Sequence, residues 1–290
     1  MIADASPANF HVLKRRLRLT GEITTVTALR IGSGGAGALD GADLPVLRDR
    51  EGFPFIPGGS LKGVLRSTVE ALLRGALPDN RHPLWPCDPH YETSRSSDRD
   101  YETSRSSDRD GACGWHASNQ RSEAQKDIGA HCPVCRLFGS RLLASHVRIT
   151  DALLHPDQRG GPPPIEVRDG VCIDRDLRVQ RNGLKYDFEV IRPGTRFAVE
   201  LFVDNPEDWL MGLLVLAFDQ LADGFAALGG FTSRGLGRVD WRWSELYRVD
   251  ARTLLAGGTG VAETDLAPTF ARYRQALTAR LEEAHRHVQA

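Results

Sequence analysis

The chain has 290 residues, of which 41% are hydrophobic and 26% charged, and its formal net charge is −1. This length and composition indicate a globular protein with a sizeable core and exclude a uniformly basic nucleic-acid-binding surface, although local basic surfaces are compatible with them. Residues 1–18 lack the apolar centre of a secretory signal, and the longest apolar run, 209–221, is too short to cross a membrane. We therefore expect a cytoplasmic protein without membrane contact.

The N-terminal part of the chain begins with an extended segment and continues into a helix. Residues 16–31 carry apolar side chains at even spacing and a β-prone threonine run, which is typical of a strand. A glycine-rich loop with the aspartates Asp40 and Asp43 follows. After a turn rich in proline and glycine, apolar side chains at intervals of three and four predict a helix with Ser60 as its N-cap.

Residues 76–138 have the composition of an insertion, polar and interrupted by glycine and proline. Within them the decamer 91–100 recurs unchanged as 101–110. Two copies are too few for a repeat architecture, so the duplication indicates a mobile loop that tolerates extra sequence.

Cysteines give this insertion a candidate metal site. Cys132 and Cys135 form a C-x-x-C pair, a spacing that lets two thiolates share one tetrahedral ion. A redox motif and a pair of packed free thiols are the alternatives. We predict a structural Zn²⁺ that pins the insertion, and we expect Cys172 to be a buried, apolar-like side chain. The expected ligands are Cys87, Cys113, Cys132 and Cys135, with His116 or His131 as substitutes.

The C-terminal part alternates strands and helices irregularly, which predicts an α+β fold. Asn182-Gly183 is a strong signal for a hairpin turn. Proline at position 206 favours a helix start, because it suits the first helical turn. The expected elements are strands at 145–151, 186–203 and 238–247, a linker at 156–164, and helices from 205 to about 222 and from about 264 to 285.

The most informative stretch is the loop 229–239, with the sequence GGFTSRGLGRV. Its four glycines let backbone N–H groups approach an anion closely, and its two arginines supply planar donors for phosphate. The spacing fits neither a Walker loop nor a dinucleotide-binding loop. The alternative is a helix C-cap that runs into a hairpin. We predict that the loop binds an anion, in particular a nucleic-acid backbone.

Six blocks then occur in one order along the chain. They are LRIGSG (29–34), ADLPVLRD (42–49), FIPGGSLKGVLR (55–66), CPVCRLFG (132–139), GVCIDR (170–175) with FEV (188–190), and the glycine loop 229–239. Together they resemble the RAMP superfamily and, more narrowly, the repeated backbone subunit of type III CRISPR interference complexes.

The resemblance implies one RAMP domain over residues 1–290, with an RRM-like, ferredoxin-type palm. The insertion 76–138 would carry the zinc, and the region 156–186, with its centre at about 172–185, would form a thumb β-hairpin. The partners it implies are a guide RNA, a target RNA, other subunits of the complex and further copies of this chain.

The resemblance also implies an activity, in which the thumb displaces a nucleotide and a loop aspartate cuts the paired target RNA beside it. Asp43 stands at the family's Asp-x-Pro position, and Asp40 is a second candidate because the loop is longer here. Such a carboxylate would take the proton of the 2′-OH or hold a divalent ion such as Mg²⁺. The expected activity is a metal-dependent endoribonuclease that leaves a cyclic phosphate.

Residues expected to bind the guide lie at the end of the first strand, at the helix start and in the glycine loop. The alternative for the helix residues is a solvated face. The set is Arg30, Gly59, Ser60, Lys62, Arg66, Gly230, Ser233, Arg234, Gly235 and Arg238.

Two other functions stay open from the sequence. One is a non-catalytic RNA-binding or capping subunit of the same complex, in which Asp43 would be incidental. The other is a guide-processing endoribonuclease of the same superfamily, which would use histidine chemistry, with His11 and His146 as the available side chains.

Overall fold

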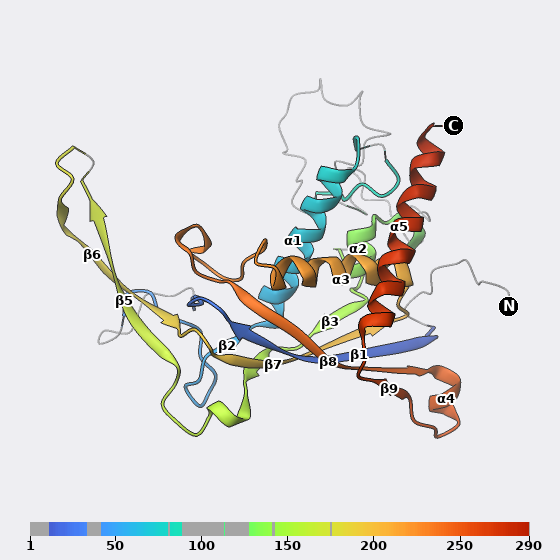
Figure 1. Cartoon of the computed structure of the whole chain (residues 1–290), viewed down its shortest axis with the longest axis horizontal. Coiled ribbons are helices and arrows are strands. Elements are labelled where there is room, and N and C mark those ends of the chain that lie inside the picture. The colour runs from blue at the N-terminus through green and yellow to red at the C-terminus, as the bar shows by residue number, and fades with distance from the viewer. Residues whose placement is uncertain are drawn as a thin grey trace, which may run out of the picture.

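The computed structural model describes residues 12–33, 42–80, 82–88, 113, 128–140, 143–174 and 176–289. The described part combines an antiparallel sheet, helices and a separate β-hairpin, which confirms the α+β prediction (Figure 1). The strands of the main sheet, in spatial order, are β2 (Phe55–Ile56), β4 (Ala152–Leu154), β7 (Arg196–Asp204), β1 (Arg15–Thr25), β8 (Val239–Asp250) and β9 (Val261–Glu263), and β3 (Val147–Ile149) also pairs with β7.

Four helices lie on one side of this sheet, as Figure 1 shows, and a fifth short helix lies beside β9. None of the described helices is long and apolar enough to cross a membrane. The helices are α1 (Gly58–Ala76), α2 (Pro133–Phe138), α3 (Asp208–Ala222), α4 (Ala251–Leu255) and α5 (Ala267–Gln289).

The core forms between the sheet and these helices because the strands alternate in polarity. On β1, Leu17, Leu19 and Ile23 are buried, while Arg16 and Arg18 remain partly exposed. On β7, each second residue is buried in the same way. The period of two thus places one apolar face of the sheet under the helices.

Helices α3 and α5 cross in close contact. A Cβ atom at Gly212 would lie 2.4 Å from the carbonyl oxygen of Tyr273, so only glycine allows this approach. The buried Tyr273 and Leu277 of α5 pack there. The helix predicted at about 264–285 is therefore confirmed, and one of its sides forms part of the core.

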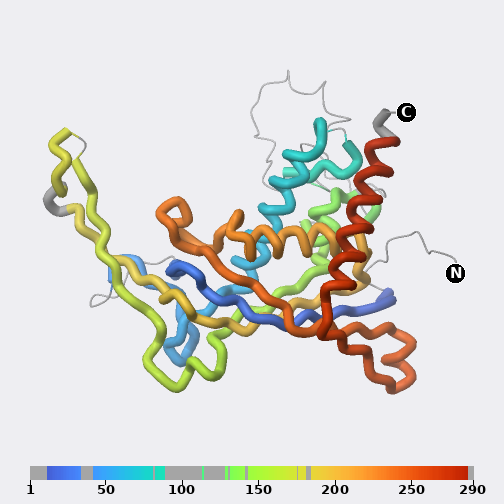
Figure 2. Tube along the Cα trace, in the orientation of Figure 1, coloured from blue at the N-terminus to red at the C-terminus, as the bar shows by residue number. Residues whose placement is uncertain are grey.

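A hairpin of β5 (Ile165–Ile173) and β6 (Gln180–Ile191) extends away from the main sheet (Figures 1 and 2). The predicted turn at Asn182-Gly183 is wrong, because both residues lie within β6. The chain reverses instead where the Asp174 carboxylate accepts the backbone N–H groups of Asp176 and Leu177. This side-chain-capped turn competes successfully with the Asn-Gly signal.

Other expectations differ from the structure in detail. The first strand ends at Thr25 rather than at residue 31, and Leu29 then forms an isolated bridge with Ile191 of β6. Cys172, expected to be buried, is exposed on the hairpin. The duplicated decamer at 91–110 lies outside the described residues, as do His11, Asp40 and His116.

Candidate functional site

Three segments that are distant in sequence meet at the base of the hairpin. The backbone of Leu44 donates to Asp187 and accepts from Glu189, so the segment after the first glycine loop runs beside β6. On the other side, Phe231 of the glycine loop packs against Phe188 of β6. The candidate loop aspartate and the candidate anion loop therefore flank the same strand.

Asp43 is exposed, and its carboxylate is oriented by one backbone contact. The N–H of Asp187 donates to Asp43 Oδ2 at 3.0 Å. This bond holds one oxygen against the base of the hairpin and leaves the other outside the contact. Such an arrangement can present a carboxylate to a ligand in a defined direction.

Two further carboxylates lie beside Asp43 on the hairpin. Asp169 of β5 and Asp187 of β6 are direct cross-strand partners, a placement that brings like charges together. The hydrogen bond between them raises the pKa of Asp187 and lowers that of Asp169, and Lys185 also contacts Asp169 at 3.3 Å. Neither aspartate was among the residues predicted from sequence.

The glycine loop packs against the backbone of Arg30, and this contact explains its glycines. Gly229 has a φ of +79°, and a Cβ atom there would lie 2.3 Å from the carbonyl oxygen of Arg30. Gly230 donates its N–H to the same oxygen at 2.8 Å. Gly237, with φ +91°, approaches Leu228 as closely. The loop thus brings Arg30 beside Arg234.

Arg30 and Arg234 both contact the ring of Phe231. Their guanidinium carbons lie 4.9 Å and 4.8 Å from its centroid. Arg234 also donates to the hydroxyl of Tyr186 at 2.8 Å, which connects the glycine loop to β6. The Nε atom of Arg30 is buried and makes no hydrogen bond within the described chain. Of this group, Phe231 and Tyr186 were missed from sequence.

Four predicted RNA-binding cations, Arg30, Lys62, Arg234 and Arg238, make no ion pair with any described acidic residue. Most described arginines elsewhere do, for example Arg16 with Asp204. Ser233, Arg234, Gly235 and Arg238 are exposed on the loop, and Gly230 is partly buried. Cations without acidic partners keep their charge available to an anion.

The N-terminus of α1 begins earlier than predicted. Its N-cap is Pro57 rather than Ser60, and the first N–H, that of Gly58, is taken by the carboxylate of Asp151 at 2.8 Å. Gly59 is exposed and Ser60 lies in the first turn. Burial, together with the positive charge of Arg66, lowers the pKa of Lys62.

The guanidinium of Arg66 is directed to other groups of the protein. Its guanidinium donates to Glu70 at 2.8 Å, to the carbonyl oxygen of Gly139 at 2.8 Å and to the Sγ of Cys135 at 3.6 Å. Its donors are thus directed to protein groups, and it connects α1 to the cysteine cluster.

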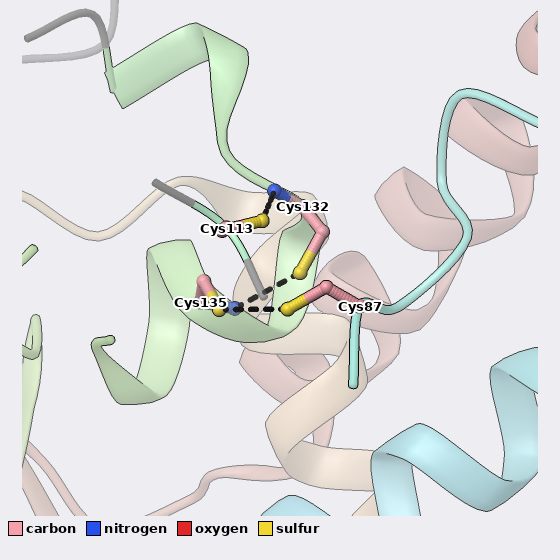
Figure 3. A group of neighbouring side chains, drawn as sticks. All are labelled: Cys87, Cys113, Cys132 and Cys135. Carbon is pink, nitrogen blue, oxygen red and sulfur yellow. Dashed lines mark hydrogen bonds between the residues drawn. The ribbon is translucent and has the colours of Figure 1, made fainter. Parts of the chain in front are cut away.

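The four predicted cysteine ligands come together although 48 positions separate the first and last of them. Their Sγ atoms all lie within 4.8 Å of one another, and Figure 3 shows the four side chains around one centre. A tetrahedral Zn²⁺ with bonds of about 2.3 Å spaces its sulfurs about 3.8 Å apart, so the group fits this ion. The group is formed by Cys87, Cys113, Cys132 and Cys135.

The electrostatics of this cluster favour a bound cation. Hydrogen bonds from Cys113, then from Cys135 and Cys87, lower the pKa of Cys132 well below that of an ordinary thiol. Hydrogen bonding to Cys113 and Cys132 raises the pKa of Cys135. The four thiols therefore resist ionising together without a positive ion among them.

His146 is a poor candidate for acid–base chemistry. It is buried, and its Nδ1 lies 2.7 Å from the backbone oxygen of Asp204. This contact places it in the core beneath β7, away from the hairpin base.

Comparison with known proteins gives one family and several relatives. A family model described as the RAMP superfamily matches residues 22–240. A protein named CRISPR system Cms endoribonuclease Csm3 from Methanocaldococcus jannaschii is 25% identical over 240 residues, which cover 79% of this chain and 80% of that protein.

Proteins of the same name from two other organisms match shorter stretches. The Enterococcus italicus protein is 46% identical over 68 residues, 23% of this chain and 31% of that protein. The Mycobacterium tuberculosis protein is 43% identical over 56 residues, 19% of this chain and 24% of that protein. The chain is thus Csm3-like, at modest identity over most of its length and at higher identity locally.

Proposed function

Because this chain belongs to the RAMP superfamily, we propose that it is a backbone subunit of a type III CRISPR complex. In this role it binds guide RNA, stacks with further copies and other subunits, and cuts target RNA paired to the guide. The similarity to Csm3 endoribonucleases supports the assignment. We place this activity in the cytoplasm, where the five free thiols would stay reduced.

The proposed architecture is one RAMP domain with a palm of the RRM-like, ferredoxin type. The order β8-β1-β7 followed by β3 and β4 supports it, since α1 follows β1 and α3 follows β7 on one side of the sheet. The β5–β6 hairpin would be the thumb, and the segment 76–138 the zinc-bearing insertion.

One observation carries the functional proposal: a loop aspartate, Asp43, and two cations that pair with no acid among the described residues, Arg30 and Arg234, converge at the base of the hairpin. Arg30, Arg234 and Arg238 would contact the ribose-phosphate chain beside the glycine loop, and Lys62 would reach it from α1. We propose Gly59, Ser60, Gly230, Ser233 and Gly235 as the backbone amides and hydroxyls of the same surface. Arg66 would not contact the RNA itself, because its guanidinium donates to Glu70 and to the carbonyl oxygen of Gly139. It would support this surface by holding α1 in place.

For cleavage, we propose that Asp43 acts on the target strand where the hairpin displaces a nucleotide. The 2′-oxygen attacks the adjacent phosphorus, the bond to the 5′-oxygen breaks, and the products are a 2′,3′-cyclic phosphate and a 5′-hydroxyl. Asp43 would accept the 2′-OH proton, and the departing 5′-oxygen would take up a proton from solvent. A divalent ion such as Mg²⁺ would stabilise the charge at the phosphate, and the neighbouring Asp169 and Asp187 support its binding here.

The first test replaces Asp43 by asparagine in a reconstituted complex. The amide oxygen can still accept the N–H of Asp187, so the loop should keep its geometry while losing the charge. Target cutting should fall by about 10²-fold or more, the range for loss of a general base or acid. Guide and target binding should stay within about twofold, measured by gel shift.

Asp265→Asn, remote from the hairpin at the start of α5, is the matched control and should cut at the wild-type rate. An Asp40→Asn variant assayed in parallel separates the two candidate aspartates. Wild-type cutting by both the Asp43 and the Asp40 variants would reject the catalytic proposal and favour a non-catalytic RNA-binding subunit.

A further inference from the structure

Phe231 has an unusual backbone for its side chain. Its φ and ψ are +61° and +28°, in the left-handed region, and only Arg178 and Asn205 share a positive φ among the described non-glycine residues. A bulky aromatic residue is disfavoured there, and glycine would be at ease. The loop contains glycines on both sides of this position, so the aromatic side chain must have a use that offsets the strain.

The contacts of the ring identify that use. The guanidinium groups of Arg30 and Arg234 lie close to the ring centroid, at 4.9 Å and 4.8 Å, and the ring of Phe188 meets it edge-on at 5.2 Å. Phe188 thus buttresses Phe231 from the hairpin base, and Phe231 in turn contacts two cations from two different segments.

An aromatic ring holds a guanidinium group without neutralising it. The ring attracts a cation through its quadrupole, whereas a carboxylate would cancel the charge and occupy the hydrogen-bond donors. Arg30 makes no ion pair within the described residues, and its Nε is buried without a hydrogen bond. Arg234 donates one hydrogen bond to the neutral hydroxyl of Tyr186. Both therefore keep their positive charge, and each keeps terminal guanidinium N–H groups for an external anion, although the buried Nε of Arg30 is not one of these donors.

We propose that Phe231 is a positioning residue: its ring orders Arg30 and Arg234 as a pair that grips neighbouring phosphates of one RNA strand. The left-handed backbone aims the ring between the two segments. This inference rests on the proposed function, because it names how the RNA-binding cations of that site are held.

Phe231→Gly is the decisive variant, since glycine suits the observed backbone and removes only the ring. Phe231→Tyr keeps the ring, and Phe231→Leu keeps apolar bulk against Phe188 without an aromatic face. We expect the glycine and leucine variants of the full chain to bind a fluorescein-labelled single-stranded RNA at least about tenfold more weakly. The tyrosine variant should bind within about twofold of wild type.

Thermal melting of the same proteins separates positioning from folding. The glycine variant loses the packing of the ring on Phe188 but is relieved of the backbone strain, so it should still unfold cooperatively, and the leucine variant, which keeps apolar bulk, should melt close to wild type. If wild type fails to bind the RNA, the proposed function fails. If wild type binds and the glycine variant binds equally well, the positioning role of Phe231 is overturned while RNA binding stands. Equal loss in the tyrosine and glycine variants would also overturn it.

Discussion

The surroundings of Lys62 lower its pKa in the protein without a bound anion. The side chain is partly buried and faces the positive charge of Arg66, and both effects lower its pKa from the ordinary value of 10.5. A bound phosphate would reverse this, because an anion stabilises the charged amine. RNA binding should therefore be accompanied by proton uptake at Lys62.

The consequence is a pH dependence with a definite sign. As the pH rises towards the lowered pKa of Lys62, the free protein loses the charge and its affinity for RNA should fall. In Lys62→Arg the guanidinium stays charged, so this part of the dependence should vanish. Fluorescence anisotropy over a pH series measures both, with Lys14→Arg as the control at a distant lysine. Parallel pH profiles for wild type and Lys62→Arg would contradict the assignment.

At the scale of single residues, the sequence predicts which residue types form the candidate site better than it predicts which groups these residues contact. The glycine loop was recognisable as a candidate from its four glycines and two arginines, whereas Asp43 became a candidate only through the resemblance to the RAMP superfamily, because loop aspartates are common at protein surfaces. Phe231 in the loop and Tyr186 and Asp187 in β6 were not recognisable, since a single aromatic or acidic residue is usually explained by ordinary packing or solvation. Arg66 stood in the expected helical stripe, and only the fold reveals that it turns towards Cys135.

At the scale of elements, the cysteine cluster joins the insertion to α1 through Arg66. Zinc ligands need such outer contacts to be oriented, and their loss typically costs 10- to 100-fold in affinity. We expect wild type to bind one Zn²⁺ per chain, with an affinity that falls at acidic pH as the thiols take up protons. Cys135→Ser should abolish tight binding, and Arg66→Met should weaken it by about 10- to 100-fold.

Competition with a chromophoric chelator measures these affinities, and the charge-transfer band of the Co²⁺-loaded protein reports the thiolate ligands. Cys172→Ser is the matched control, because Cys172 is exposed on the hairpin and outside the cluster. Unchanged binding in Cys135→Ser would reject the four-cysteine site.

Helices were predictable where the local spacing of apolar residues and proline determines them. The helices α3 and α5 follow from apolar spacing and the proline at position 206, and the observed bounds differ from the expected ones by only a few residues. The hairpin turn and the start of α1 were misplaced for one reason. In both, an aspartate side chain, Asp174 or Asp151, satisfies backbone N–H groups, and the sequence does not show which turn an aspartate will cap.

At the scale of the whole molecule, the hairpin stands apart from the sheet and is apolar without being buried. Ile173, Leu177 and Val179 are 61%, 73% and 55% exposed. Exposed apolar groups on a projecting hairpin indicate a contact with a partner, and the proposed function supplies one in the next copy of the chain.

Shortening the hairpin tests this contact. Replacing residues 172–184 by Asn-Gly joins Val171 to Lys185, which are already cross-strand partners, and leaves Tyr186 and Asp187 in place. The palm should melt as wild type and bind RNA within a few-fold, but native mass spectrometry should show loss of multi-copy assemblies and target cutting should lose its regular interval. Leu254→Ser, at an exposed site beside β9, is the control. Intact assemblies would refute the contact.

The two sides of β6 carry incompatible chemistries in alternation. The hydroxyl of Tyr186 accepts from Arg234 and the ring of Phe188 packs against Phe231, whereas the backbone N–H of Asp187 donates to Asp43 and the carboxylate of Glu189 accepts the N–H of Val46. A one-residue shift in the register of Tyr186–Glu189 against the palm would exchange the two sets and turn acidic side chains towards the glycine loop. The base of β6 must therefore keep its register, whereas the irregular pairing between Val171 and Ile173 shows that the distal part of the hairpin accepts a change in strand length.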